Sequence, residues 1–296
     1  MTSPASDPLP AWSEPFTSPA GDQLARVPGL ENIDREWAWG GATGKGITVA
    51  IVDTGVEGDH PLVRGRLVDS VAVEIQDGEP EIVPAEPIDL IGHGTACAGI
   101  IAGIAPEVDI VSVRVLGADL KGKGAAFAAG LEYVIERPVQ VANLSLSSKS
   151  EALFPIFHDL ADAAYFRRVV LVSAVNNVGG ASYPSLFSSV ISVAAHSEPD
   201  PFRFYYNPNP PVEFGAWGLD VPIAWANGGE TVATGNSFAA PHITALVALM
   251  LSKHPGLTPF EVKAILASVA NNAQPDVAGT TSPRKAAARG KRGSGR

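Results

Sequence analysis

Three short segments of this chain each place a reactive side chain within two residues of a glycine. Asp53 follows the β-rich apolar run 47–52, His93 stands between two glycines, and Ser237 follows Gly-Asn at the start of an apolar stretch. A carboxylate at the end of a buried strand is costly unless it is paired or well hydrogen-bonded. A serine hydroxyl is a weak nucleophile alone, and a neighbouring base activates it. The three residue types together indicate nucleophilic catalysis by serine.

Each segment taken alone also has a simpler interpretation. Asp-Thr-Gly opens the site of aspartic proteases, but their chemistry needs two carboxylates that share a proton, and no second DTG or DSG exists here. Only a homodimer would supply that pair. His93 alone fits a structural histidine, and Ser237 alone fits a helix N-cap. Because Ala239 replaces the last glycine of a G-x-S-x-G elbow, an α/β-hydrolase is disfavoured.

The elements that must position these residues alternate along the chain. Short apolar strands that alternate with helices are typical of a parallel α/β sheet, whose strand carboxyl ends are where ligands bind. A short helix is expected within 32–39. The expected strands are 47–52, 110–115, 139–146, 169–174 and 190–194, and the expected longer helices are 94–103, 124–136, 237–252 and 259–270.

The charge is unevenly distributed. The 296 residues include 21 basic and 31 acidic side chains, a net charge of −10, yet the last 13 residues carry six basic side chains and no acid. The remainder therefore carries −16. Such a body repels nucleic acid and anionic membranes, and no apolar run approaches the ~18 residues of a membrane helix. We expect neither partner, and the oligomeric state is not predicted.

The ends of the chain differ in composition from its middle. Residues 1–30 are rich in Pro, Ser and Gly and are expected to wrap the surface or stay mobile, and 276–296 are expected to form a disordered basic tail. One domain is expected between them, at 31–275. The N-terminus lacks the pattern of a signal peptide, and the single cysteine, Cys97, fits a reducing compartment, so a cytoplasmic location is predicted.

The three motifs occur in the order Asp, His, Ser, which is the order of the subtilisin triad. With this order, the chain resembles the subtilisin-like serine proteases, or subtilases, over about residues 31–272. The segments 37–46, 114–117 and 143–146 are also similar to that family. The resemblance implies a three-layer α/β fold, with an open, mostly parallel sheet and helices on both faces. About 46 residues precede the first expected strand, which is fewer than the pro-domain typical of secreted relatives needs, and this favours an intracellular enzyme.

The resemblance assigns roles to individual residues. Ser237 would attack the scissile carbonyl, His93 would accept and return its proton, and Asp53 would orient the imidazole. Asn177 would stabilise the oxyanion from a turn after strand 169–174. Asn176 stands where the family usually has glycine, and asparagine tolerates the left-handed backbone expected there.

The resemblance also implies a peptide-binding groove in which substrate pairs with extended backbone on both sides. The matching residues are Leu120, Lys121 and Gly122 on one side, and Ser145, Leu146 and Ser147 on the other. Ser147 and Ser148 replace the family's frequent Gly-Gly. Together with Asn176 they are expected to narrow the pocket for the residue before the cut bond, which favours small or medium neutral side chains.

Cofactors and metals are not expected. The segment 98–106 runs directly into the next strand, without the calcium-binding loop of many secreted subtilases, so no strong calcium site is predicted. Cys97 lies four residues after His93, on the same side of the expected helix, where we expect it to fill core space.

The sequence therefore predicts a serine endopeptidase that forms an acyl-enzyme, with an intracellular processing role. Two alternatives stay open. An amine could resolve the same acyl-enzyme, which would make the protein a peptide ligase or macrocyclase. A weakly active subtilase-like binding module would keep the fold and bind peptide with little turnover.

Overall fold

The strand that ends in Asp53, β1, is an interior strand, the fourth in order, of a nine-stranded sheet. The computed structural model describes residues 33–209 and 211–273, so the predicted extension 1–30 and tail 276–296 lie outside the described residues. The sheet order is β3-β2-β4-β1-β5-β6-β7-β9-β8, and the bounds of its strands are β1 (Thr48–Asp53), β2 (Leu67–Gln76), β3 (Glu79–Pro84), β4 (Asp109–Arg114), β5 (Val141–Leu144), β6 (Val170–Ala174), β7 (Ile191–His196), β8 (Phe204–Tyr206) and β9 (Phe214–Trp217).

The sheet is mostly parallel, as the alternating pattern predicts. Six neighbouring pairs from β2 to β9 are parallel, and only the edge strands β3 and β8 run antiparallel to their neighbours. β1 is buried because it pairs with β4 on one side and β5 on the other, and because helices cover both faces of the sheet around it. Its carboxyl end presents Asp53 at the edge of the sheet where ligands bind in such folds.

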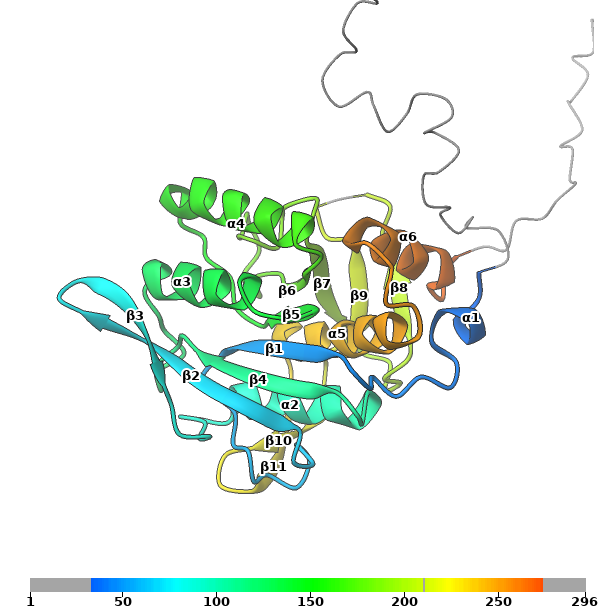
Figure 1. Ribbon diagram of the computed structural model, residues 1–296. Coiled ribbons are helices and arrows are strands. Elements are labelled where there is room, and N and C mark those ends of the chain that lie inside the picture. Colours follow the sequence, from blue (N-terminus) through cyan, green and yellow to red (C-terminus); the bar gives the residue numbers. More distant parts are fainter. Residues whose placement is uncertain (1–32, 210, 274–296) are drawn as a thin grey trace, which may run out of the picture. The chain divides into compact units, whose positions relative to one another are not determined.

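Helices cover both faces of this sheet (Figure 1). The bounds of the helices are α1 (Arg35–Trp39), α2 (His93–Ile104), α3 (Gly124–Ile135), the short 3-10 helix η3 (Glu151–Leu153), α4 (Phe154–Phe166), α5 (Asn236–Lys253) and α6 (Pro259–Val269). α3 and α4 pack on one face, and α2 and α5 lie together on the other. Every residue of α5 from Phe238 to Leu251 is buried, so this helix is an internal one that fixes the position of Ser237 at its start. The three-layer α/β fold is confirmed.

The structure contains elements that the apolar runs did not predict. These are the β2–β3 hairpin, the short strands β8 and β9, helix α4, and a separate two-stranded hairpin of β10 (Val221–Trp225) and β11 (Gly229–Ala233). The strands among them lie in the outer two positions at each end of the sheet or in the separate hairpin, and their apolar stretches are short or alternate with exposed residues, so they are weaker signals than the buried central strands. The predicted strand 139–146 is shorter than expected, because β5 ends at Leu144.

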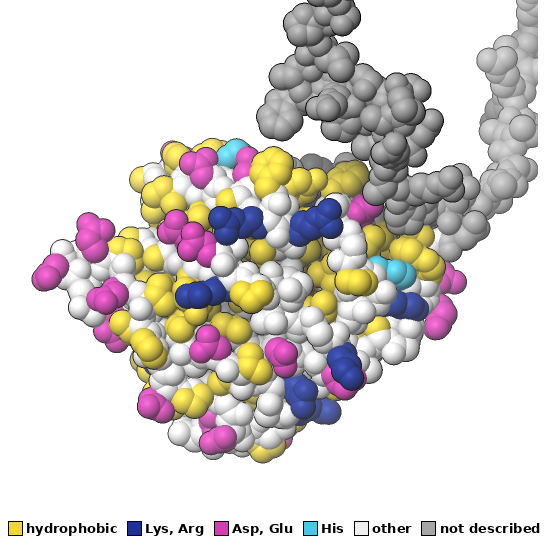
Figure 2. Space-filling model, in the orientation of Figure 1, with side chains coloured by type: hydrophobic (Ala, Val, Ile, Leu, Met, Phe, Trp, Pro, Cys, Tyr) yellow, Lys and Arg dark blue, Asp and Glu magenta, His cyan; other side chains and the backbone are white. Residues whose placement is uncertain are grey.

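The surface is acidic over part of the sheet edge. Figure 2 shows Asp and Glu side chains over the β2–β3 hairpin, where Glu74, Asp77, Glu79 and Glu81 are all exposed. Among the helices within 33–209 and 211–273, none combines the length and the hydropathy needed to span a bilayer.

Candidate active site

Asp53 and His93 form a buried hydrogen-bonded pair. Asp53 is fully buried at the end of β1, and its Oδ1 accepts hydrogen bonds from His93 Nδ1 at 2.7 Å and from the Thr54 backbone N–H at 2.8 Å. His93 is the first residue of α2, and it is 7% exposed. Because a carboxylate only accepts, Nδ1 carries the proton and Nε2 of the neutral imidazole is left as the base.

The surroundings of His93 favour its charged form. Burial, the largest single influence, lowers the pKa of His93. The charge of Asp53, the hydrogen bond to Asp53 and the charge of Asp89 each raise this pKa, and together they outweigh burial, so the pKa of His93 lies above its ordinary value. A positively charged imidazole next to a buried carboxylate is the arrangement that general-base catalysis requires after proton transfer.

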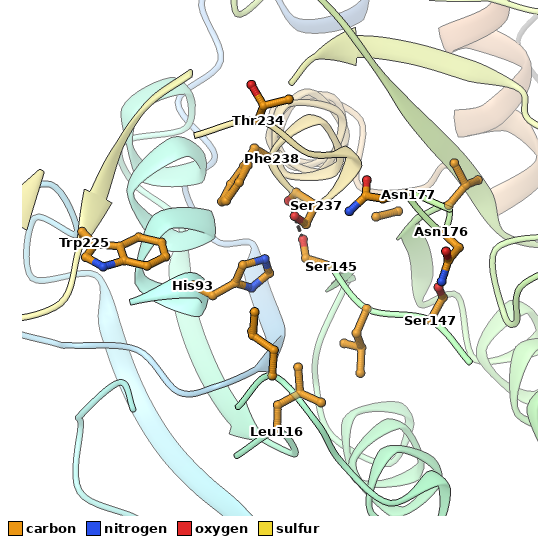
Figure 3. A pocket seen from close by; sticks show the side chains of 14 residues that line it. His93, Leu116, Ser145, Ser147, Asn176, Asn177, Trp225, Thr234, Ser237 and Phe238 are labelled. Atoms are coloured by element: carbon orange, nitrogen blue, oxygen red, sulfur yellow. Dashed lines mark hydrogen bonds between the residues drawn. The ribbon is translucent and has the colours of Figure 1, made fainter. Parts of the chain in front are cut away.

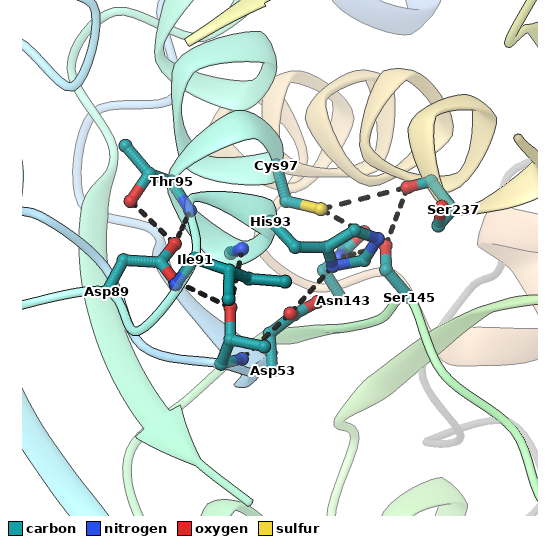
Figure 4. Close-up of polar contacts among 11 residues, drawn as sticks. Asp53, Asp89, Ile91, His93, Thr95, Cys97, Asn143, Ser145 and Ser237 are labelled. Atoms are coloured by element: carbon teal, nitrogen blue, oxygen red, sulfur yellow. Dashed lines mark hydrogen bonds and ion pairs between the residues drawn. The ribbon is translucent and has the colours of Figure 1, made fainter. Parts of the chain in front are cut away.

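Ser237 is positioned from beneath by a chain of neutral hydrogen bonds (Figure 4). Its backbone carbonyl accepts from Ser145 Oγ at 2.8 Å, and Ser145 Oγ accepts from Asn143 Nδ2 at 3.0 Å. Asn143 Oδ1 in turn accepts from Thr244 Oγ1 at 2.9 Å. The helix α5 has no side-chain cap, so Ser237 does not act as an N-cap. This finding removes the simpler interpretation of the third motif.

His93 and Ser237 line the same cavity (Figure 3). A hydrogen bond from Ser237 Oγ to His93 is not among the contacts of the described residues. Such catalytic contacts are commonly long in unliganded enzymes and shorten when substrate binds.

Asn177 is oriented so that its amide N–H₂ faces the Ser237 hydroxyl. Its Oδ1 accepts from the Asn236 backbone N–H at 3.0 Å. This bond uses the oxygen end of the amide, so the Nδ2 end of Asn177 is free to face the space next to Ser237. A Cβ placed on Gly235 would lie 3.1 Å from Ser237 Oγ and 3.7 Å from Asn177 Nδ2. Both atoms therefore border one small space, which only glycine at position 235 leaves open, and a developing oxyanion would find a donor there.

Asn236 has a structural role that sequence reasoning missed. Its Oδ1 accepts from the Ala195 backbone N–H at 2.9 Å and its Nδ2 donates to the Val175 carbonyl at 3.1 Å. These bonds tie the start of α5 to the ends of β6 and β7. The only signal in the sequence is a polar residue directly before the serine.

The predicted substrate residues line two adjoining cavities. The first, of about 390 Å³, contains Leu120, Ser145, Leu146, Ser147, Asn176 and Asn177 beside His93 and Ser237. Lys121 and Gly122 line the second, of about 350 Å³, which shares Leu116, Leu120, Leu146 and Ser147 with the first. The two predicted sides of the groove are thus brought together.

The backbone at Asn176 differs from the expectation. The left-handed conformation falls on Gly179 and Gly180, with φ of 45° and 90°, and not on Asn176. Asn176 instead accepts from the Val178 N–H at 2.8 Å through its Oδ1, which closes the turn. The turn therefore keeps Asn177 in place without a strained residue before it.

The residues of the first cavity that were not predicted include Trp225, Thr234 and Phe238. Trp225 comes from the β10–β11 hairpin, and the Phe238 ring lies 5.4 Å from the His93 ring, between centroids. Gly92, with φ of 111°, makes room for Trp225, since a Cβ there would lie 3.0 Å from its ring. The available signal was a tryptophan at the end of the short apolar run 221–225, directly before a turn that contains Asn227, Gly228 and Gly229.

Asp53, His93 and Cys97 have potential metal-ligand atoms within 4.8 Å of one another. Cys97 is fully buried, and burial, followed by the charge of Asp53, raises the pKa of its thiol well above the ordinary value. A protonated thiol is a poor metal ligand. Cys97 Sγ lies 3.3 Å from Ser145 Oγ, so the thiol packs against the hydrogen bonds that hold the serine.

Comparisons with known proteins agree with this geometry. The Subtilase family model matches residues 44–286. The chain is 30% identical to an intracellular serine protease of Paenibacillus polymyxa, covering 77% of this chain and 74% of that protein. It is also 30% identical to subtilisin BL of Lederbergia lenta, covering 78% and 86%. It matches the minor extracellular protease Epr of Bacillus subtilis at 30% identity, but spans only 36% of that longer protein.

A solved structure has the same fold. The crystal structure of a cold adapted subtilisin-like serine proteinase superposes with a TM-score of 0.65 and 28% identity, covering 83% of this chain and 93% of that one. The chain belongs to the subtilase family and is a serine endopeptidase.

Proposed function

We propose that Asp53, His93 and Ser237 form the catalytic triad of this endopeptidase. The observation that carries the proposal is the 2.7 Å bond between His93 Nδ1 and Asp53 Oδ1 in the wall of the cavity that Ser237 also lines. Ser237 Oγ attacks the scissile carbonyl while His93 Nε2 takes its proton. His93 then gives this proton to the leaving amine, and an acyl-enzyme remains. Water attacks the acyl-enzyme by the same route in reverse, which releases the acid and restores the serine.

Asn177 Nδ2 and the Ser237 backbone N–H are the proposed oxyanion donors. The support is the shared space beside Gly235 and the uncapped start of α5, whose free N–H groups carry partial positive charge. Donors that are fixed before the reaction stabilise the developing charge without reorganisation.

The proposed substrate is an extended peptide that lies between Leu120–Gly122 and Ser145–Ser147. The adjoining cavities that these segments line support this placement. Ser147 and Asn176 narrow the pocket for the residue before the cut bond, and small or medium neutral side chains are the proposed preference there. A peptide library in which bulky aromatic side chains are preferred would contradict this specificity.

The catalytic domain is proposed to span 31–275, to act without a metal or other cofactor, and to serve in intracellular processing. The support for the location is the single cysteine and the intracellular relative. The support for metal-independent catalysis is that Asp53 and His93 bond directly to each other. Neither nucleic acid nor a membrane is a proposed partner.

Mass spectrometry of peptide products tests the proposed function. Hydrolysis adds the mass of one water, about 18 Da, to the summed products, whereas ligation or cyclisation adds none. We expect hydrolysis by the wild type and its abolition in Ser237→Ala. Products without added water would indicate the ligase, and a folded wild type without turnover would indicate the binding module.

A further inference from the structure

A second carboxylate, outside the proposed triad, lies next to it. Asp89 belongs to the loop before α2, and its two oxygens accept four hydrogen bonds (Figure 4). Oδ1 accepts from Thr54 Oγ1 at 2.7 Å and from the Ile91 N–H at 3.0 Å. Oδ2 accepts from the Thr95 N–H and from Thr95 Oγ1, both at 2.7 Å.

Three of these four donors belong to the two segments that carry the acid and the base, and the fourth, the Ile91 N–H, lies in the loop of Asp89 itself. Thr54 directly follows Asp53, and Thr95 lies in the first turn of α2, two residues after His93. Both hydroxyls also accept: Thr54 Oγ1 from the Gly94 N–H at 3.1 Å, and Thr95 Oγ1 from the Glu57 N–H at 2.9 Å. Asp89 is therefore the central acceptor of a network that fastens the end of β1 to the start of α2.

Only an ionised carboxylate satisfies this network. All four groups around Asp89 donate, and each hydroxyl has its proton committed to Asp89 because it accepts from a backbone N–H. An amide of the same shape would turn its N–H₂ toward two of these donors. Among residues 33–209 and 211–273, no Lys or Arg forms an ion pair with Asp89, so its negative charge is not cancelled by one.

The charge of Asp89 also reaches the base. It is one of the causes that raise the pKa of His93, after burial, which opposes it, and the charge and hydrogen bond of Asp53. The other groups that face His93 are Cys97 from its own helix and the uncharged Phe238 and Trp225 from α5 and β10. The Glu57 carboxylate is also nearby in the chain, but it accepts a hydrogen bond from the Asn227 N–H at 2.8 Å and is not one of the groups that face His93.

We propose that Asp89 is a positioning residue of the active site, whose ionised carboxylate holds Asp53 and His93 in register and supports the positive charge that forms on His93 during acylation. This inference rests on the triad proposed above. Asp89 itself touches no reacting atom; it acts through the segments that carry Asp53 and His93.

The test is the isosteric variant Asp89→Asn, with kcat and KM measured per active site titrated by a fluorophosphonate. We expect kcat to fall about 10- to 100-fold, the usual effect of a small misplacement, with KM changed less than about threefold. Removing a negative charge lowers the pKa of His93, so the acid limb of kcat/KM moves to lower pH. A purely structural residue would lower the titrated fraction and leave the limb in place.

Asp34→Asn is the matched control, because Asp34 also accepts a backbone hydrogen bond, from Trp37 N–H at 2.7 Å, at the start of α1. Its kcat and pH profile should equal those of the wild type. A titrated kcat of Asp89→Asn within about twofold of the wild type, or an acid limb that does not move, would overturn the proposal. A wild type that the fluorophosphonate does not label would instead refute the triad.

If Asp89→Asn fails to fold, a second pair of variants carries the test. Thr95→Val removes the hydroxyl that bonds Asp89 and keeps the side-chain shape, whereas Thr95→Ser keeps the hydroxyl. We expect Thr95→Val to lose about tenfold in titrated kcat and Thr95→Ser to retain most of it. Equal kcat values for the two variants would overturn the proposal.

Discussion

Two buried histidines near the active site, one at the start of α2 and one inside α5, have opposite properties. His93 is 7% exposed and its pKa is raised, whereas His242 is 3% exposed and burial lowers its pKa to about 4. His242 Nδ1 donates to the Phe238 carbonyl at 2.9 Å, and no carboxylate bonds it among the described residues. Burial alone therefore keeps a histidine neutral, and the carboxylates beside His93 are what make it a base that accepts a proton.

The largest expected effect comes from removing the charge of Asp53, the carboxylate that bonds His93 and that His242 lacks. In Asp53→Asn, the imidazole loses its charge partner and its preferred tautomer, and kcat should fall about 10⁴-fold. The pKa of His93 should then move down toward that of His242, because burial is no longer opposed by Asp53. Steady-state kinetics with active-site titration measures the first effect, and histidine NMR the second. A His93 pKa that stays raised would show that Asp53 is not its cause.

The next largest effect is expected at the proposed oxyanion site beside α5, where uncharged N–H groups and not a carboxylate would stabilise the transition state. Asn177→Ala removes the proposed side-chain oxyanion donor and should lower kcat about 100- to 1000-fold with KM nearly constant, the loss found for subtilisin itself. The acid limb should not move, since no charge changes. Asn207→Ala, in a remote exposed turn, is the control. An equal rise in KM would indicate a role in substrate binding instead.

These expectations show what the sequence could and could not predict. The motifs at Asp53, His93 and Ser237 were predictable because each occupies the end of a buried strand or the start of a helix, and such ends are marked by apolar runs and glycine. Asp89 and Asn236 were not, because Asp89 links its own loop to Thr54, and Asn236 bonds Ala195 and Val175, which come near them only in the folded chain. Hairpin β10–β11 and helix α4 were missed for a different reason, because each has exposed residues among its buried ones and its apolar signal is therefore weak.

His242 should affect the pH dependence of the free energy of unfolding and should not affect kcat. Because its folded pKa is about 4 and its unfolded pKa is near 6.5, the unfolded chain binds the extra proton between these values. Stability should therefore fall as the pH falls from about 6.5 to 4, by about 3 kcal/mol from this group. His242→Leu should flatten that slope in urea unfolding and leave kcat unchanged. An unchanged slope would mean that His242 is not kept neutral.

The smallest expected effect concerns a charge far from both histidines. Lys263 Nζ donates to the Ser188 and Val190 carbonyls at 2.6 and 2.9 Å, and pairs with Glu213 at 2.6 Å, with both side chains about four-fifths buried. Lys263→Met leaves these acceptors without a donor and should cost about 1–3 kcal/mol of stability. Thermal unfolding measures this loss, while the acid limb of activity should stay fixed. A moved limb would show long-range coupling to His93.

The most direct measurement of the central claim is to locate the adduct that a fluorophosphonate forms with the folded protein. An activated serine reacts with such a probe, and an ordinary surface serine does not. Peptide mapping by mass spectrometry should place one adduct on Ser237, with labelling that follows the deprotonation of His93 as the pH rises and nearly vanishes in Asp53→Asn. An adduct on another residue, or labelling of Ser237 that is indifferent to both pH and Asp53, would contradict the account.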